Sequence, residues 1–291
     1  MPELPEVEVL VRHLNRLLPG RVVRGVQVLR PRIVRPTHVE ELQKALVGAR
    51  FVSVTRRGKF LLFHLSRSKR RDSSFRLLGH LGMTGRMYLL EAPRQLPKHA
   101  AVVLHLGKHK FVFEDTRYFG RFSLDCTAIE KLGLEPLGEN FTARLLSVAL
   151  KTSRQPIKVK LLDQAAVCGV GNIYASEALH MARISPLTPA SSLSPQQLQR
   201  LHLAIRSVLL EAVTAGSTVP LNFSGEGARD GLFCYGSTSE TPAYYEERLR
   251  VYDRADAECL WGCGARIKRI VQAGRSTYFC PRCQPRKYSG K

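Results

Sequence analysis

The sequence has few acidic residues for its length. Its 291 residues include 24 Asp and Glu against 45 Lys and Arg, which gives a net charge of +21 and an isoelectric point near 10.2. Residues 9–39 hold seven arginines and no acid, and residues 259–291 hold eight Lys and Arg and no acid. Such a balance is typical of proteins that bind a polyanion. Nucleic acid is the expected partner; the alternative is a basic protein that has none.

Long apolar runs are also missing, so the sequence predicts no membrane-spanning helix. The N-terminal residues are acidic and then amphipathic, whereas a secretory signal begins basic and continues apolar. We therefore expect a cytoplasmic location and no membrane partner. The hydrophobic content of 44% indicates a globular protein, and the length is enough for two domains.

Cysteines are few, and without a secretory signal the seven that are present do not predict a disulfide framework. Cys126, Cys168 and Cys234 are scattered along the chain, and we expect buried, unreactive thiols at these positions.

The remaining cysteines form two close pairs, Cys259-x3-Cys263 and Cys280-x2-Cys283, separated by 16 residues. This spacing is typical of a tetrahedral structural Zn²⁺ site on a β-hairpin, with no open ligand position for catalysis. Four basic residues lie between the pairs, so the hairpin is expected to contact phosphate. They are Arg266, Lys268, Arg269 and Arg275.

The chain begins Met1-Pro2-Glu3. If Met1 is removed, Pro2 has a free secondary amine beside the carboxylate of Glu3. An α-amino group has a pKa of about 8, so part of it is neutral at physiological pH and can attack a carbonyl-like carbon to form a Schiff base. The alternative is a frayed terminus with solvated charges.

The apolar spacing that follows argues against a frayed terminus. Apolar residues recur at intervals of three and four up to Pro19-Gly20, which predicts an amphipathic helix that holds the N-terminus against a core. The apolar positions are Leu4, Val7, Val9, Leu10, Val11, Leu14, Leu17 and Leu18.

The next part of the chain predicts a β-rich domain of about 130 residues. Short runs of β-forming residues are separated by turn residues, which is typical of a sandwich or barrel. Residues 56–59, with Gly58 before Lys59, are expected to form a hairpin turn. The predicted strands are 22–28, 51–55, 60–65, 75–81, 86–90, 101–106, 111–114 and 121–124, with a short helix at 40–46.

Beyond a linker at 133–138 the pattern becomes helical. Ser194 is the expected N-cap and Pro195 the first residue of the longest helix, which ends near Ala212. Residues 220–245 have no clear period and are a candidate substrate lid. The other predicted helices are 143–150, 157–167 and 173–181.

Three loops have residues suited to nucleic acid. The turn at residues 168–174 leads into a helix N-terminus, where backbone N–H groups and Asn172 could hold a phosphate; a plain helix connection is the alternative. The loops 82–85 and 115–120 present Met83, Arg117 and Phe119, which could fill the gap left by an extruded base. Core packing of Met83 and Phe119 is the alternative.

Taken in order, six motifs resemble the bacterial formamidopyrimidine-DNA glycosylase family. They are MPELPEVE, RRGKFLL, HLGMTG, DTRYFG, LLDQ with GVGNIYASE, and GRSTYFCPRCQ, and together they cover nearly the whole chain. The resemblance implies an α+β multidomain fold: an N-terminal β-sandwich (1–131), a helix-two-turn-helix domain (132–250) and a β-hairpin zinc finger (251–291). Double-stranded DNA would bind in the cleft between the halves.

The resemblance also implies roles for single residues. Pro2 would be the nucleophile at the sugar C1′ and Glu3 the acid/base that helps open the ring. Lys59 would contact the backbone and donate a proton in β-elimination, and Arg275 would hold phosphate and assist δ-elimination. His99, Lys158 and Asn172 would contact DNA, whereas Met83, Arg117 and Phe119 would fill the void opposite an everted base. Cys259, Cys263, Cys280 and Cys283 would bind one structural Zn²⁺.

The expected function is therefore that of a monomeric glycosylase and lyase that excises oxidised purines, 8-oxoguanine and formamidopyrimidines, and cuts abasic strands. Two rivals stay open: an endonuclease VIII-like enzyme for oxidised pyrimidines, and a non-catalytic damaged-DNA-binding protein. Three segments depart from the expected family pattern. They are the x3 spacing of the first cysteine pair, an apparent insertion at 66–72, and the long 220–245 segment that bears on substrate choice.

Overall fold

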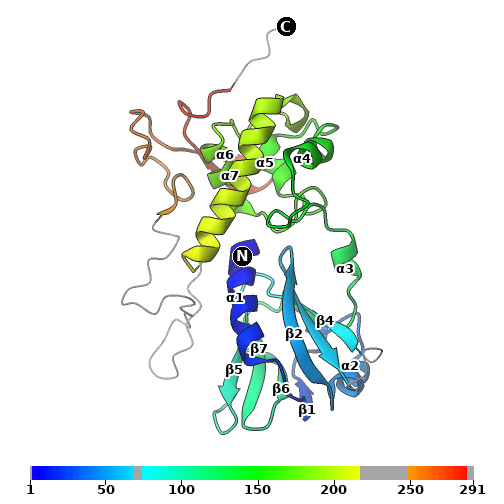
Figure 1. Cartoon of the computed structure of the whole chain (residues 1–291). Helices are drawn as coiled ribbons and strands as arrows, with labels where there is room; N and C mark the ends of the chain where they lie inside the picture. Colours follow the sequence, from blue (N-terminus) through cyan, green and yellow to red (C-terminus); the bar gives the residue numbers. More distant parts are fainter. Residues whose placement is uncertain (1, 68–73, 217–247, 287–291) are drawn as a thin grey trace. The chain divides into compact units, whose positions relative to one another are not determined.

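The computed structural model describes residues 2–67, 74–216 and 248–286, which divide into two compact units (Figure 1). Unit 1 comprises described residues up to Glu130, and unit 2 comprises the described residues from Lys131 onward. Cys234, the candidate lid 220–245 and most of the apparent insertion 66–72 lie outside the described residues.

Helix α1 (Leu4–Leu17) opens unit 1, close to the predicted bounds. Pro5 lies in its first turn, where a missing N–H costs no helical hydrogen bond. Leu4, Val7 and Leu14 are fully buried on one face, as their spacing predicts. The Asn15 side-chain oxygen accepts a hydrogen bond from the backbone N–H of Val54 at 2.7 Å, which fastens the end of α1 to the neighbouring strand.

Two four-stranded antiparallel sheets form the β-sandwich of unit 1, in the orders β1-β6-β7-β5 and β2-β3-β4-β8 (Figure 1). The first strand was predicted to start at Val22, but Val22 forms only an isolated bridge to Arg50. The backbone N–H of the next residue, Val23, donates to the Ala49 carbonyl rather than to a strand of the β1 sheet. The elements are β1 (Gly25–Val28), η1 (Pro31–Ile33), α2 (Val39–Leu46), β2 (Arg50–Arg57), β3 (Phe60–Ser66), β4 (Ser74–His80), β5 (Gly85–Glu91), β6 (Ala100–His105), β7 (His109–Asp115) and β8 (Arg121–Ser123).

Aromatic side chains from both sheets form the centre of this core. Phe63 of β3 meets Phe111 of β7 edge-to-face, with ring centroids 5.6 Å apart, and Phe122 of β8 lies 6.1 Å from Phe111. All three rings are fully buried. Burial of such large apolar surfaces is the main driving force for closing the two sheets on each other.

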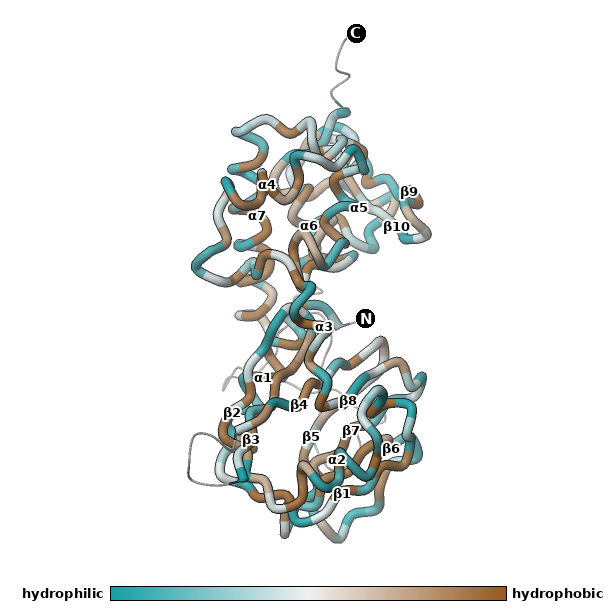
Figure 2. Tube along the Cα trace, turned by 90° about the vertical axis from the view of Figure 1, so that its right-hand side faces the viewer, coloured by the Kyte–Doolittle hydropathy of each residue, from teal (hydrophilic) through white to brown (hydrophobic). Residues whose placement is uncertain are grey.

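Unit 2 is helical, and a β-hairpin follows its helices. Figure 2 shows both hydrophilic (teal) and hydrophobic (brown) residues along its longest helix, α7. Ser194 caps that helix as predicted: its Oγ accepts the Gln197 backbone N–H, and the Gln197 side chain accepts the Ser194 N–H. The elements are α4 (Ala143–Leu150), α5 (Ile157–Leu161), α6 (Asn172–Met181), η3 (Ala190–Ser192), α7 (Pro195–Thr214), β9 (Lys268–Gln272) and β10 (Arg275–Phe279). A short helix, α3 (Thr127–Glu130), precedes unit 2.

Two predictions about this half were wrong. The helix predicted at 157–167 ends at Leu161, because Asp163 accepts the Ala165 N–H in a local turn that competes with the helix. The predicted linker at 133–138 is packed: Gly133 donates its N–H to the Gln164 carbonyl at 2.9 Å. Among the helices that the structure describes, none combines the length and the apolarity needed to cross a membrane.

Candidate catalytic and DNA-binding site

Pro2 is half-buried just before α1, and the first two carboxylates that follow it in the sequence are buried in unit 1. Glu3 is 2% exposed and Glu6 is 1% exposed. The Glu3 backbone N–H donates to the Glu6 carboxylate at 2.7 Å. That N–H belongs to the peptide bond that Pro2 forms, so Glu6 fixes the orientation of the terminal peptide. Sequence reasoning missed Glu6, although its place three residues after Glu3 is a capping-box signal.

Lys59 is presented by the two-residue turn between β2 and β3, as predicted. Arg57 pairs with Phe60 across the turn, and Gly58 has a φ of 55°, which a glycine adopts without strain. Arg56 donates to the Glu8 carboxylate of α1 at 2.8 Å and to the Gly58 carbonyl at 3.0 Å. The Lys59 turn is therefore tied to the first turns of α1, and Lys59 itself is 6% exposed.

His80 lies at the end of the same sheet, paired with Phe60 on one side and Arg121 on the other. Burial, together with the charges of Lys59 and Arg121, lowers the pKa of His80 to about 4. The neutral ring accepts the Gly82 N–H at Nδ1, at 3.1 Å, which leaves Nε2 as a hydrogen-bond donor. Sequence reasoning missed His80, although it stands directly before the LGMTG motif.

The two predicted loops 82–85 and 115–120, named here the probe loops, leave their large side chains exposed. Met83 is 43% exposed and Phe119 is 49% exposed, which rules out the core-packing alternative. The Arg117 guanidinium lies over the Phe119 ring, 4.9 Å from its centroid. The structure thus brings Arg117 and Phe119 together at the surface of unit 1.

Asp115 joins the two probe loops. Its fully buried carboxylate accepts the Thr84 hydroxyl at 2.6 Å, the Arg117 N–H at 3.1 Å and the Gly120 N–H at 2.8 Å. Gly82, with a φ of 61°, allows this approach, because a Cβ there would lie 2.7 Å from the backbone nitrogen of Gly120.

His99 contacts one of these loops rather than standing alone. Its Nδ1 lies 3.3 Å from the Tyr118 hydroxyl, and its carbonyl accepts the Asp115 N–H at 3.0 Å. Tyr118 has a φ of 53°, a left-handed conformation that costs energy in a non-glycine residue. His99 therefore supports the backbone that exposes Phe119.

In unit 2, Asn172 and Lys158 meet on the zinc-finger hairpin. Asn172 is the first residue of α6, and its amide donates to the Ser276 carbonyl of β10 at 3.0 Å. Lys158 is fully buried, and its ammonium donates to the Asn172 side-chain oxygen and, at 3.3 Å, to the Ser276 carbonyl. The predicted residues thus form one polar cluster, in which Lys158 orients Asn172.

Arg275 lies next to this cluster and is exposed. It pairs with Gln272 across a turn in which Ala273 and Gly274 both have positive φ, 47° and 72°. Such two-residue turns match the twist of a hairpin. The turn therefore places the Arg275 guanidinium at the tip of the hairpin.

Glu177 anchors the segment that leads into the finger. Its buried carboxylate accepts the backbone N–H groups of Arg250, Val251 and Tyr252 at 2.8–2.9 Å. The Tyr252 hydroxyl in turn accepts from Asn172 at 3.4 Å. Glu177 is the last residue of the GVGNIYASE motif, but no local sequence pattern predicted that it would anchor residues 250–252.

The four predicted zinc ligands converge. The sulfur atoms of Cys259, Cys263, Cys280 and Cys283 all lie within 4.8 Å of one another, with Cys259–Cys283 at 3.9 Å and Cys263–Cys280 at 3.5 Å. A tetrahedral Zn²⁺ with bonds of about 2.3 Å holds its sulfur ligands at about 3.8 Å from each other, so the four thiols fit this metal.

The wider first cysteine pair is accommodated by glycine. Gly262 has a φ of 64° and its N–H donates to the Cys259 carbonyl at 3.0 Å, which closes a turn around the additional residue. His180 lies 3.7 Å from the Cys259 sulfur and stacks on Trp261 at 4.0 Å. The finger is thereby packed on α6.

The two units define a basic, zinc-finger protein with a β-sandwich in which Pro2 directly precedes the buried carboxylate of Glu3. Three family models match in order: the formamidopyrimidine-DNA glycosylase N-terminal domain at residues 1–122, its H2TH domain at 132–222, and the zinc finger found in FPG and IleRS at 263–286.

Relatives match over the whole chain. Formamidopyrimidine-DNA glycosylases of Chloroflexus aurantiacus and Pelotomaculum thermopropionicum are 40% and 38% identical, covering 98% of this chain and 98% and 99% of their own length. The structure of Lactococcus lactis Fpg in complex with DNA containing an abasic site has a TM-score of 0.83 and 32% identity, covering 98% of this chain and 100% of that one. The chain belongs to the formamidopyrimidine-DNA glycosylase family. It is a DNA glycosylase of base excision repair.

Proposed function

We propose that the chain excises oxidised purines, 8-oxoguanine and formamidopyrimidines, from double-stranded DNA through a Schiff base on Pro2, and then cuts the abasic strand. The observation that carries this proposal is the N-terminal arrangement. Pro2 adjoins the buried Glu3, Glu6 holds the terminal peptide, and Arg56 ties the Lys59 turn to α1.

The chemistry follows from one amine. With Met1 removed, the Pro2 nitrogen attacks C1′ of the damaged nucleotide, the C1′–base bond breaks and the base leaves with a proton. The proton on the attacking Pro2 nitrogen passes to the departing base, which restores the nitrogen lone pair. That lone pair then expels O4′, which takes a proton from Glu3, and an iminium forms at C1′.

The iminium acidifies the C2′ proton, and its loss expels the 3′ phosphate. Lys59 donates the proton that this β-elimination requires. A second elimination releases the 5′ phosphate, which Arg275 holds. The base and the two phosphates each leave with the electron pair of the bond that breaks, and every step moves electrons in pairs, so no oxidant or reductant is needed.

The other residues bind DNA. Lys158, Asn172 and His99 contact the DNA or orient side chains that contact the DNA backbone. Met83, Arg117 and Phe119 fill the void opposite the everted base. Eversion costs a few kcal/mol and costs least at a weakened pair, which favours damaged sites. One Zn²⁺ on the four thiolates of the finger maintains the fold of the hairpin that carries Arg275; it supplies no catalytic step.

We propose three domains for these roles: the catalytic β-sandwich at 1–131, the helix-two-turn-helix domain at 132–250 and the zinc finger at 251–291. The family matches at 1–122, 132–222 and 263–286 support them. We propose action as a monomer in the bacterial cytoplasm, in association with the nucleoid. Sedimentation of the complex with damaged duplex as a single protein copy would support the monomer, and a two-copy complex would refute it.

Borohydride trapping tests the central step. Wild-type protein with an abasic duplex and borohydride should give a covalent complex, because reduction fixes the iminium on Pro2. Pro2→Gly should weaken trapping and an N-terminal block should abolish it. Mass spectrometry should find Met1 removed. Full activity with Met1 retained refutes the proposal, and so does duplex binding without any trapping, which is the behaviour of a non-catalytic damage-binding protein.

Lesion preference is a separate measurement. Single-turnover excision from oligonucleotides should be faster for 8-oxoguanine and formamidopyrimidine than for thymine glycol, because the Met83, Arg117 and Phe119 set is complete in this chain. Faster release of thymine glycol would assign the endonuclease VIII-like preference instead.

A further inference from the structure

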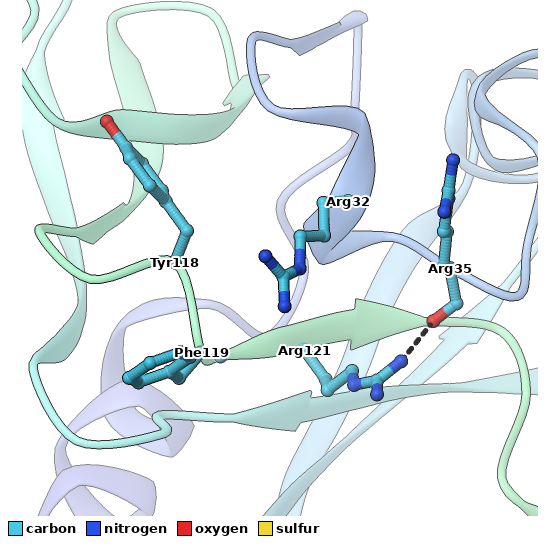
Figure 3. A pocket seen from close by; sticks show the side chains of 6 residues that line it. Arg32, Arg35, Tyr118, Phe119 and Arg121 are labelled. Atoms are coloured by element: carbon cyan, nitrogen blue, oxygen red, sulfur yellow. Dashed lines mark hydrogen bonds between the residues drawn. The ribbon is translucent and has the colours of Figure 1, made fainter.

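A pocket with several arginines lies beside the second probe loop (Figure 3). It has a volume of about 280 Å³ and is lined by Arg32, Arg35, Tyr118, Phe119, Gly120 and Arg121, which we name the arginine pocket. Figure 3 shows the Arg32 guanidinium directed into the space in front of Phe119 and Arg121, with Arg35 at the edge. None of these arginines belongs to the six sequence motifs; Arg121 directly follows DTRYFG.

The pocket is built by two segments that hydrogen bonds lock together. Arg121 opens β8 and donates to the Arg35 carbonyl at 3.2 Å (Figure 3). Two residues further along each segment, the Thr37 hydroxyl lies 2.8 Å from the Ser123 hydroxyl and accepts the Leu124 N–H at 3.0 Å. The walls are therefore fixed before any ligand arrives, which lowers the entropic cost of binding.

The pocket has positive charge that carboxylates do not cancel. Within residues 2–67, 74–216 and 248–286, Arg32, Arg35 and Arg121 form no salt bridge. Hydrogen bonds from Thr127 lower the pKa of the nearby Asp125 carboxyl, and the Arg121 charge adds to this effect. Arg32 and Arg35 are exposed, and no acid neutralises them in this part of the chain.

Guanidinium groups around a concave, preformed space suit a phosphate group, which accepts several of their N–H donors at once. Phe119 indicates which DNA strand carries the phosphate. It lines this pocket, and it also belongs to the set proposed to fill the void opposite the everted base. A ring that replaces the departed base stacks against the nucleotide left on the other strand. The groups proposed for the damaged strand, Lys59 and Arg275, are not among the residues that line this pocket.

We propose that the arginine pocket binds one backbone phosphate of the undamaged strand, within a few nucleotides of the position opposite the lesion. The inference rests on the proposed function, because that function brings Phe119 into the duplex. Its effect is to hold the undamaged strand in register while the damaged nucleotide is everted. Phosphate contacts of this kind position a duplex without reading its sequence.

The test uses the full-length zinc-loaded protein and duplexes that contain a tetrahydrofuran abasic analogue. Single neutral methylphosphonates are placed, one per duplex, along either strand around the lesion. For wild-type protein, one methylphosphonate on the undamaged strand should weaken binding about tenfold, the range of one charge-assisted hydrogen-bonded contact.

Arg32→Ala and Arg121→Ala should each weaken binding to the unmodified duplex to a similar extent and should no longer respond to that methylphosphonate. Their salt slopes should decrease by about 0.9, the value for one lost phosphate contact. Arg32→Ala is the cleaner variant, because its guanidinium makes no hydrogen bond or ion pair within the described residues.

Arg24→Ala is the matched control, since it removes the same charge from an exposed position just before β1. β1 begins opposite His105, whereas the second probe loop follows Asp115 at the other end of that sheet. Arg24→Ala should keep the wild-type response to every methylphosphonate.

Three results would overturn the proposal: a response in Arg32→Ala that equals wild type, an equal loss in Arg24→Ala, or a lost response on the damaged strand only. These binding results are independent of borohydride trapping. Protein that binds as expected but is not trapped would refute Pro2 catalysis and leave the arginine pocket standing.

Discussion

Among single residues, Asp115 has the largest effect on the geometry of the probe loops. One buried carboxylate accepts hydrogen bonds from Thr84, Arg117 and Gly120, which come from both loops. Because both of its oxygens are used, an amide at this position must place its NH₂ group against a donor. The exposure of Phe119 therefore depends on a residue that never meets the substrate.

Asp115→Asn should lower the free energy of unfolding by about 1–3 kcal/mol, the cost of one unsatisfied buried polar group. Single-turnover excision should slow about tenfold or more, because Arg117 and Phe119 lose their fixed backbone. Urea denaturation and oligonucleotide cleavage measure the two effects. Asp256→Asn, at an exposed acid, is the control and should change neither. A variant with wild-type excision would remove Asp115 from the positioning set.

The lowered pKa of His80 predicts that the free energy of unfolding depends on pH. Its folded-state pKa is about 4, below the ordinary value of 6.5, so the unfolded chain binds more protons than the folded chain between these values. The contribution of His80 is therefore complete above pH 6.5 and is lost as the pH falls toward 4.

Between pH 7 and pH 5.5, His80→Gln should lose about 1 kcal/mol less stability than the wild-type protein. Denaturant titrations of both proteins at the two pH values measure the difference. The comparison cancels the contributions of His13 and His180, whose pKa burial also lowers to about 4. Parallel losses in the two proteins would show that His80 titrates normally.

At the scale of elements, the β9–β10 hairpin depends on its metal. Its core contains few apolar residues, Val251, Ile267 and Tyr278 among them, and the four cysteines belong to the same cluster. Small units with cores of this size need a metal or disulfides to fold. Arg275 and the Ser276 carbonyl that holds Asn172 both belong to this hairpin.

Removing zinc with a chelator should therefore weaken DNA binding before the β-sandwich unfolds. Trp261, the single tryptophan, stacks on His180 beside Cys259, so its fluorescence reports the state of the finger alone. Loss of affinity should follow the fluorescence change, while circular dichroism of the β-sandwich persists, and added Zn²⁺ should restore both. Normal DNA affinity in stripped protein would limit the finger to a scaffold.

For the whole molecule, the excess of positive charge sets the background affinity for DNA. A net charge of +21 attracts any duplex, damaged or not, and this attraction weakens with salt as counterions compete.

Binding to an undamaged duplex should fall by about 10³- to 10⁵-fold between 50 and 200 mM salt if six to ten phosphates are contacted. Fluorescence anisotropy across this salt range measures the slope. Binding to an abasic duplex should fall with a similar slope from a higher affinity, because Phe119 and Met83 add contacts that salt does not screen. A flat response for both duplexes would contradict electrostatic binding.

Local patterns predicted most of the elements. The α1 bounds, the Lys59 turn and the Ser194 cap follow from spacing, one glycine and one capping motif, all within a few residues of each other. The failures had longer-range causes. The helix from 157 ended early because Asp163 forms its own turn, and the supposed linker at Gly133 bonds to residue 164.

The sequence by itself determined the family motifs, the positive charge, the zinc ligands and the proline at position 2 that we propose as the nucleophile, because each is written in residue types and short spacings. Only the tertiary structure decided that Asp115 joins two loops, that Lys158 turns toward Asn172, and that Arg32 and Arg121 share a pocket. The pairs Thr84–Asp115, Lys158–Asn172 and Arg32–Arg121 are 31, 14 and 89 positions apart. Chain closure over these distances is set by the packing of whole sheets and helices, which no local pattern encodes.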